Sequence, residues 1–282
     1  MKTLGEVLKL STVYLQERNV DRARRMAEEL IAFTLQLKRL DLYMQFDRPL
    51  EEGELTSIRE HLKRKAKGEP LEYIFGTVQF YHCSFEITPA VLIPRPETEL
   101  LIHSICEEIK GVDLKGKVAW DLCCGSGCLG ISLKKRFPEL RVCLSDRSKE
   151  ALVLARRNAQ KNGVQVEFFE GDLLAPFQGQ RADLVICNPP YVSEAEYAAL
   201  EPSVRDFEPR MALVGGKQGV EFYQRLNAEL GLSLNPGAKV YFEIGATQGE
   251  AVKSLFNASC WKSKKLEKDL AGHDRFFYLE FE

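Results

Sequence analysis

The chain has 282 residues, of which 45% are hydrophobic and 28% are charged, and its formal net charge is −2. This balance is typical of an ordinary soluble globular protein with one large domain or two modest ones. The near-zero charge excludes an overall basic field that would attract nucleic acid or an anionic membrane, although a local patch could still serve.

The N-terminal segment is not a secretory signal, because Glu6 and Lys9 interrupt it before an apolar stretch develops. No later stretch is long and apolar enough to span a bilayer, so we expect a cytoplasmic protein without membrane contact. The eight cysteines are expected to be reduced and buried. Cys123, Cys124 and Cys128 lie close in sequence but lack the paired spacing and nearby histidines of a zinc site. We therefore expect no metal.

Residues 1–72 are expected to form a small bundle of helices. Apolar residues recur there at helical spacing in several segments. One face of the first segment consists of Leu4, Val7, Leu8, Ser11 and Leu15. Gly68 is well placed to end a later helix. Because short amphipathic helices are not stable in isolation, they are expected to pack against one another.

The sequence pattern changes near residue 73. Residues 73–95 alternate aromatic and β-branched side chains around Gly76, which predicts a β-hairpin that links two domains. In residues 96–282, short apolar strands alternate with amphipathic helices. The expected strands include VAWDLC, RVCLS, VEFFE and ADLVIC. This alternation predicts an α/β fold with a mainly parallel sheet, in which ligands bind at the carboxyl ends of the strands.

A glycine-rich loop follows the first of these strands, which is expected to end at Asp121. Gly125, Gly127 and Gly130 have the G-x-G-x-x-G spacing of dinucleotide-binding proteins. In that motif the first glycine directly follows the strand, so that the backbone can approach a pyrophosphate. Here a carboxylate and three further residues come first, and a carboxylate would repel phosphate. The loop therefore favours a cationic ligand over a nicotinamide or flavin.

S-adenosylmethionine meets this requirement, because it carries an ammonium and a sulfonium group but no phosphate. Asp121 would attract the ammonium group, and Asp146 at the second strand end would accept the ribose hydroxyls. Asp172 after the third strand would bind the adenine amino group, with Leu173 against the ring. Each aspartate alone is more often a helix cap or loop residue. Three at successive strand ends favour one shared cofactor site.

The fourth strand is followed by Asn188, Pro189, Pro190 and Tyr191. The Asn188 side chain and the Pro189 carbonyl offer two hydrogen-bond acceptors, and the prolines fix the backbone without adding competing N–H groups. Two such acceptors would hold both hydrogens of a planar amino group, so that its nitrogen faces the methyl donor. Tyr191 would pack on the face of that group. The alternative interpretation is a rigid turn without a ligand.

This arrangement would work by positioning the methyl acceptor. An amide nitrogen is a very poor base, so we expect in-line attack on the methyl carbon, with the proton lost after methylation has made the nitrogen acidic. Alignment and strengthening hydrogen bonds would supply most of the rate. We therefore predict that no side chain acts as a general base.

These motifs resemble class I methyltransferases that act on planar amino nitrogens, which include adenine-N6 DNA methyltransferases and protein glutamine-N5 methyltransferases. The resembling segments are D-x-x-x-G-S-G (121–127), Asp146, GDL (171–173) and NPPY (188–191). Further segments look like the release factor glutamine methyltransferase family, also called HemK or PrmC. They are EPLEYIFG (69–76), LIPRPETE (92–99), FEP (207–209), AL (212–213), FEIGATQGE (242–250) and DLAGHDR (269–275). The resemblance covers essentially the whole chain.

The resemblance implies a class I, Rossmann-like methyltransferase domain at 96–282, preceded by a helical bundle at 1–72 and a linking hairpin at 73–95. It implies methylation of the glutamine in the Gly-Gly-Gln motif of class I peptide chain release factors, on the side-chain amide nitrogen. The bundle would dock the release factor, and S-adenosylhomocysteine would be the product. We expect a monomer without direct nucleic-acid binding.

The site residues follow from these motifs. The expected cofactor contacts are Asp121, Cys123, Cys124, Gly125, Ser126, Gly127, Asp146, Asp172, Leu173 and Asn188. Asn188 to Tyr191 would hold the glutamine, with Asn188 and Pro189 as the catalytic pair. The family usually has glycine where Cys123 stands. Because a Cβ atom strains a positive φ, we expect Cys123 to adopt a negative φ.

Three alternatives remain. A glutamine methyltransferase of a ribosomal protein would share the NPPY motif and differ mainly in the N-terminal region. An adenine-N6 nucleic acid methyltransferase would share the pocket but would need a basic face, which the near-neutral composition does not provide. A non-catalytic binding module would have lost NPPY, which is intact here.

Overall fold

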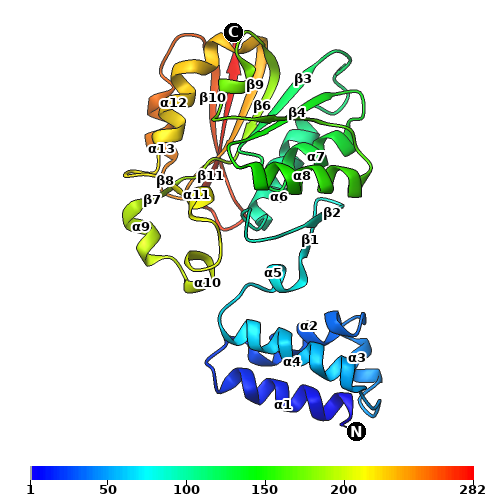
Figure 1. Ribbon diagram of the computed structural model, residues 1–282. Coiled ribbons are helices and arrows are strands. Elements are labelled where there is room, and N and C mark those ends of the chain that lie inside the picture. Colours follow the sequence, from blue (N-terminus) through cyan, green and yellow to red (C-terminus); the bar gives the residue numbers. More distant parts are fainter. Residues whose placement is uncertain (1) are drawn as a thin grey trace. The chain divides into compact units, whose positions relative to one another are not determined.

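The computed structural model describes residues 2–282, which divide into two compact units (Figure 1). The first unit contains the described residues up to Gly76 and also Pro202–Phe207. The second contains Thr77–Glu201 and Glu208–Glu282. A short segment from late in the sequence thus belongs to the N-terminal unit. No helix within residues 2–282 has the length and apolar character needed to cross a bilayer.

The first unit is a set of short helices around an apolar core. Its helices are α1 (Leu4–Gln16), α2 (Ala23–Thr34), α3 (Asp41–Met44), α4 (Glu52–Ala66), α5 (Leu71–Phe75) and α10 (Pro202–Arg205). All five residues expected on one face of α1 are buried, which confirms the amphipathic pattern. Thr3 and Glu6 form a capping box that satisfies the first N–H groups of α1. Gly68, with φ of 93°, follows the end of α4, as expected.

The second unit is built on a seven-stranded sheet with the order β10-β11-β9-β6-β3-β4-β5. Its strands are β3 (Val118–Leu122), β4 (Arg141–Asp146), β5 (Glu167–Glu170), β6 (Ala182–Cys187), β9 (Leu234–Glu243), β10 (Trp261–Lys268) and β11 (Asp274–Phe281). Strands β5, β4, β3, β6 and β9 are parallel neighbours, and β11 runs antiparallel between β9 and β10. The mainly parallel sheet expected from the sequence is confirmed.

Helices cover both faces of this sheet (Figure 1). On one face lie α6 (Pro96–Glu108), α7 (Cys128–Arg136) and α8 (Lys149–Asn162), and on the other α12 (Glu221–Glu229) and α13 (Gly249–Leu255). Short 3-10 turns, η1 (Ala175–Phe177) and η2 (Leu230–Leu232), complete the layers. Because both faces are covered, the central strands are mainly apolar, and the acidic residues Asp121, Asp146 and Glu243 lie towards their carboxyl ends. Trp120 of β3, for example, is fully buried and stacks on Phe177 with ring centroids 4.3 Å apart.

The β-hairpin precedes the large sheet and belongs to the second unit. It consists of β1 (Thr77–Phe80) and β2 (Cys83–Glu86), which pair antiparallel. It lies within the expected range 73–95 and begins directly after Gly76. Gly76 ends α5 with φ of 68°, and the two-residue turn is formed by Tyr81 and His82, with φ of 42° and 63°. A turn with two positive φ values matches the twist of paired strands, which favours this geometry even without glycine.

Two asparagines of α8 attach the hairpin to the sheet layer. Asn158 accepts from the Glu86 N–H (2.6 Å) and donates to the Glu86 carbonyl (3.1 Å). Asn162 makes the same pair of bonds with Ser84, at 3.1 and 2.9 Å. Asn158 also donates to the carbonyl of Ser126 in the glycine-rich loop (2.9 Å). One helix therefore fixes the hairpin and the loop together.

A small parallel sheet of two strands follows β6 in the chain. It pairs β7 (Val192–Ser193) with β8 (Val214–Gly216). The chain between them carries α9 (Glu194–Ala199), α10 and α11 (Arg210–Leu213). Glu208 in this excursion is buried, where it accepts from the Ile93 N–H (3.1 Å) and forms an ion pair with Arg95.

Candidate active site

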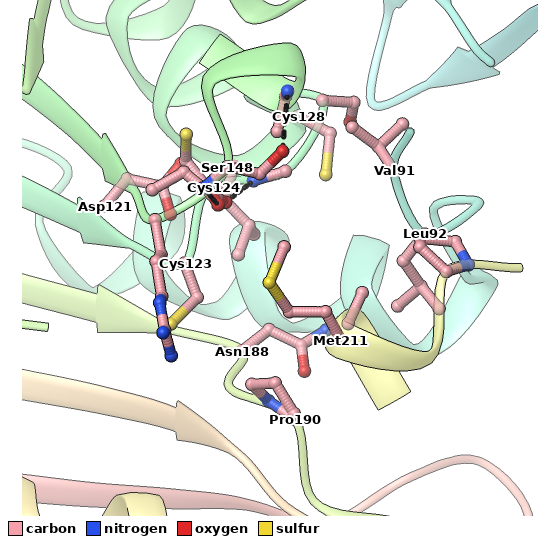
Figure 2. A pocket seen from close by; sticks show the side chains of 18 of the residues that line it. Val91, Leu92, Asp121, Cys123, Cys124, Cys128, Ser148, Asn188, Pro190 and Met211 are labelled. Carbon is pink, nitrogen blue, oxygen red and sulfur yellow. Dashed lines mark hydrogen bonds between the residues drawn. The ribbon is translucent and has the colours of Figure 1, made fainter. Parts of the chain in front are cut away.

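A cavity lies at the carboxyl ends of the parallel strands, where the sequence places its candidate site (Figure 2). Figure 2 shows Asp121, Cys123 and Cys124 on one side, Leu92 on the opposite side, and Asn188 and Met211 between them. Ten of the expected site residues line it, namely Asp121, Cys123, Cys124, Gly125, Ser126, Asp146, Asp172, Leu173, Asn188 and Pro190. Gly127, Pro189 and Tyr191 are not among the lining residues.

Asp121 occupies the floor of this cavity at the end of β3. Its side chain is 1% exposed, and Oδ2 accepts from the Gly130 N–H (2.8 Å). A Cβ atom at Gly130 would come within 2.9 Å of that oxygen, so glycine is needed for the carboxylate to approach helix α7. Oδ1 is buried and has no hydrogen-bond partner among the described residues. Burial raises the pKa of Asp121 to about 7, despite the Gly130 bond.

The glycine-rich loop corrects one expectation. Cys123 has φ of 57°, whereas the sequence suggested a negative value. The loop must turn at this residue because Cys124 donates to the Ser145 carbonyl (3.0 Å) and Gly125 donates to the Asp146 carboxylate (2.8 Å). A left-handed conformation costs a residue with a Cβ atom about 1–2 kcal/mol, and these bonds offset that cost.

Asp146 is largely enclosed at the end of β4. Its Oδ2 atom receives the Gly125 N–H, and Oδ1 receives the Ser148 N–H (2.8 Å). Burial raises its pKa, while these backbone bonds favour the ionised form. Each carboxylate oxygen has a second lone pair, so both can still accept a ligand hydroxyl. Asp172, after β5, instead forms an ion pair with Arg225 (2.7 Å).

The turn after β6 presents Asn188 to the cavity (Figure 2). Within residues 2–282, neither the Asn188 side chain nor the Pro189 carbonyl receives a hydrogen bond. The next two carbonyls are enclosed. A Cβ atom at Gly215 would clash with the Pro190 carbonyl oxygen, so β8 packs directly on the turn. The Tyr191 carbonyl accepts from Gln248 Nε2 (2.8 Å).

Sequence reasoning missed a buried polar group beside this turn. Glu243, at the end of β9, is 1% exposed, and its Oε2 atom accepts from the Thr98 hydroxyl (2.7 Å). The Tyr191 hydroxyl lies 3.5 Å from Oε1. Burial raises the pKa of Glu243 to about 7, against the Thr98 bond and the Arg275 charge. Tyr191 therefore points away from the cavity lining and towards β9.

Other lining residues were also missed. The segment after the hairpin contributes Ala90, Val91, Leu92 and Pro94, and the excursion contributes Pro209, Met211 and Ala212. The family-like segments LIPRPETE, FEP and FEIGATQGE contain several of the missed residues and neighbours. Their spacing carries no chemical pattern of its own, so only the fold reveals that they meet.

The three neighbouring cysteines line the same cavity, and Cys123 is half-buried, whereas the sequence suggested that it is buried. Burial raises the pKa of the Cys124 thiol well above its usual value, and that of Cys128 to about 12. Burial therefore favours the thiol forms of Cys124 and Cys128. Among the described residues, no group of three or more histidine, cysteine, aspartate or glutamate side chains has the geometry of a metal site.

The cavity fits S-adenosylmethionine by the chemistry of its donors and acceptors. The Asp121 oxygen without a partner requires a donor, which the ammonium group would supply. The Asp146 carboxylate keeps free lone pairs, as argued above. Leu173 and Phe222 add apolar lining. No phosphate-binding cluster of basic groups replaces this acidic floor, since Arg147 is the one Lys or Arg among the lining residues.

Comparison with known proteins identifies the family of the chain. Residues 6–76 match the family model of the PrmC N-terminal domain, and residues 96–205 match that of the methyltransferase small domain. A release factor glutamine methyltransferase of Geobacter sulfurreducens is 39% identical over 273 residues, covering 97% of this chain and 95% of that protein. This chain belongs to the release factor glutamine methyltransferase family.

Further relatives extend the comparison for this methyltransferase. The Bacillus subtilis family member is 39% identical over 282 residues, covering 98% of this chain and 96% of that protein. Among solved structures, a methyltransferase of Pyrococcus furiosus has a TM-score of 0.51 at 22% identity, covering 70% of this chain and 87% of that one.

A T. thermophilus 16S rRNA methyltransferase, solved with AdoMet and guanosine, has a TM-score of 0.53 at 15% identity. The match covers 73% of this chain and 50% of that one. At this identity the two structures show a shared fold. The class I methyltransferase fold expected for the chain is confirmed, and the chain is an enzyme of that class.

Proposed function

We propose that this methyltransferase transfers a methyl group from S-adenosylmethionine to the side-chain amide nitrogen of the glutamine in the Gly-Gly-Gln motif of class I peptide chain release factors. One observation carries the proposal for the site. Asn188, whose side-chain carbonyl is free to accept a hydrogen bond, lines the same cavity as the unpartnered Asp121 carboxylate oxygen. The names of the nearly full-length relatives support the acceptor protein.

Different residues would bind the cofactor and the substrate amide. Asp121, Asp146 and the loop backbone bind the cofactor, which supplies the methyl group. The Asn188 side-chain carbonyl and the Pro189 carbonyl accept the two hydrogens of the substrate amide. Within residues 2–282, no histidine lines the cavity. The reaction therefore depends on alignment, and on acceptors that strengthen as positive charge develops on the nitrogen.

We also propose that the helical unit docks the release factor. Its described surface carries three exposed apolar side chains around α3, Leu40 (74%), Tyr43 (46%) and Met44 (84%). Exposed apolar groups gathered in one segment are typical of a protein-binding surface. The domain assignment from the sequence, with docking by residues 1–72, remains a prediction that this surface supports.

Variants in this surface test the docking proposal. Leu40→Asp with Met44→Asp should raise the KM for an intact release factor about tenfold or more, because hot-spot side chains carry most of the binding energy. Methylation of a short Gly-Gly-Gln peptide should not change. Leu232→Asp, at an equally exposed position of the second unit (81%), serves as the matched control. Equal KM values for both variants would refute a docking role for this surface.

The acceptor protein is tested with labelled S-adenosylmethionine and three acceptors: a purified class I release factor, ribosomal proteins and DNA. Mass spectrometry of the labelled peptide locates the methyl group. We expect it on the Gly-Gly-Gln glutamine, and Asn188→Ala should reduce transfer about 10²-fold or more. Label on a ribosomal protein or on adenine alone would favour one of the other two acceptors instead.

A further inference from the structure

The side chain of Gln248 is attached to the back of the Asn188 turn. It is 8% exposed and makes three hydrogen bonds. Nε2 donates to the Tyr191 carbonyl (2.8 Å) and to the Gly219 carbonyl (3.2 Å), and Oε1 accepts from the Gly245 N–H (2.9 Å). A primary amide is the neutral side chain that offers two N–H groups on one nitrogen together with an acceptor, and here all three functions are used.

The two carbonyls that Gln248 joins would repel each other without it. A Cβ atom at Gly219 would clash with the Tyr191 carbonyl oxygen, so the two backbones are in direct contact. Both carbonyl oxygens carry partial negative charge, and both lie in a buried region. Removing a shared donor there leaves two acceptors unsatisfied and facing one another. The turn would then move away from Gly219.

Gln248 is itself held on a rigid element. It is the N-cap residue of α13, and its backbone N–H bonds to the Gly245 carbonyl (2.9 Å) while its carbonyl receives the Val252 N–H (2.8 Å). Val252 is fully buried in the core of the second unit. The backbone of Gln248 is therefore held in place, so its side-chain amide can fix the position of the turn.

Movement at Tyr191 would reach the methyl acceptor site. The two prolines that separate Tyr191 from Asn188 have fixed φ angles, so the turn has fewer rotatable bonds with which to absorb a displacement of Tyr191. The carbonyls of Pro190 and Tyr191 are both held from behind, by Gly215 and by Gln248. Asn188 lines the cavity, and within residues 2–282 neither its side chain nor the Pro189 carbonyl receives a hydrogen bond. A displacement of one ångström is enough to cost a large factor in rate.

We infer that Gln248 is a positioning residue for the methyl acceptor site, which aligns the Asn188–Pro189 pair without touching substrate or cofactor. This inference rests on the proposed function of that pair. Gln248 does not line the cofactor cavity, so its loss should affect turnover much more than cofactor binding.

Gln248→Glu and Gln248→Met test the inference in the full-length enzyme. Both should lower kcat about 10–100-fold at pH 8, with the KM for the acceptor protein and the Kd for S-adenosylmethionine within about twofold of wild type. Gln224→Glu, an exposed glutamine on α12, should leave kcat unchanged and serves as the matched control.

The pH profile separates positioning from a general loss of structure. A protonated glutamic acid at position 248 can donate to the Tyr191 carbonyl, whereas its ionised form repels both carbonyls. The kcat of Gln248→Glu relative to wild type should therefore rise as the pH falls from 8.5 to 6. The same ratio for Gln248→Met should not depend on pH.

Two outcomes would overturn the inference. One is kcat within about twofold of wild type for both variants. The other is a loss that appears equally in cofactor affinity or in folding, including failure of both variants to fold. The acceptor is first established with the wild-type enzyme, and the variants are measured on whichever acceptor that enzyme methylates. An error in the proposed substrate and an error in the proposed role of Gln248 would then give different results.

Discussion

Asp121 combines burial, an unpartnered oxygen and a pKa raised to about 7. A carboxyl in this state stabilises a cationic ligand only when it is ionised. Since burial favours the protonated form, ionisation requires a pH above the raised pKa or the arrival of the positive charge. The affinity for S-adenosylmethionine should therefore depend on pH near neutrality.

Asp121→Asn tests this expectation. The asparagine oxygen can still accept from Gly130, so the fold should persist, while the charge is lost. The Kd for S-adenosylmethionine at pH 8 should rise about thirtyfold, which corresponds to about 2 kcal/mol for a hydrogen bond to a charged group. Titration calorimetry should also show that wild-type affinity weakens as the pH falls through about 7, whereas the variant shows no such step. Asp47→Asn, at an exposed position of the first unit, is the control.

Equal affinity of Asp121→Asn and wild type at pH 8 would contradict the role of Asp121.

The backbone conformation of Cys123 shows how tertiary contacts override a local preference. Its left-handed backbone is tolerated because neighbouring N–H groups reach Ser145 and Asp146 from that conformation. The local preference of a residue with a Cβ atom yields to two hydrogen bonds in the tertiary structure.

At the scale of elements, the pairing of β7 with β8 places Gly215 against the Asn188 turn. The pair is parallel and only two to three residues long, so it contributes little on its own. The pairing brings Gly215, which has no side chain, into contact with the backbone of Pro190. This close approach supports the turn at Pro190 and Tyr191.

Gly215→Ala should therefore damage activity more than stability. Its Cβ atom would clash with the Pro190 carbonyl and push the turn forward. We expect kcat to fall about tenfold or more, with a loss of about 1–3 kcal/mol in the free energy of unfolding. Gly53→Ala is the matched control, because its Cβ atom meets nothing within 4 Å in α4. That control should keep full activity and gain up to about 1 kcal/mol in helix stability.

Steady-state kinetics and urea denaturation of both alanine variants measure these effects. Full activity of Gly215→Ala would show that the turn tolerates displacement. In that case the inference about Gln248 would lose its physical basis as well, because both residues act on the same backbone.

At the scale of the whole molecule, the second unit holds two buried carboxyl groups with pKa values raised to about 7, Asp121 and Glu243. Burial is the main cause for each. Between the ordinary pKa and about 7, the folded state binds more protons than the unfolded state. The free energy of unfolding should therefore decrease as the pH rises through this range.

Glu243→Gln should weaken this dependence. The contribution of one such group is on the order of 3 kcal/mol at full ionisation, so the decrease between pH 5 and pH 8 should become smaller by up to about that amount. Urea denaturation at several pH values measures it. Glu250→Gln, at an exposed position, should leave the dependence unchanged. An identical pH dependence for Glu243→Gln and wild type would show that proton binding by Glu243 does not cause the dependence.

The sequence by itself determined the parallel sheet, the amphipathic face of α1, and the aspartates and the Asn188 turn at the strand ends. These features are local, because hydrophobic period and strand-end residues can be read within a short window. Only the tertiary structure decided the φ of Cys123, the hairpin turn at Tyr81 and His82, and the meeting of Gln248 with Tyr191 across 57 residues. These depend on hydrogen bonds and close backbone contacts between distant segments, whose free energies no local pattern records.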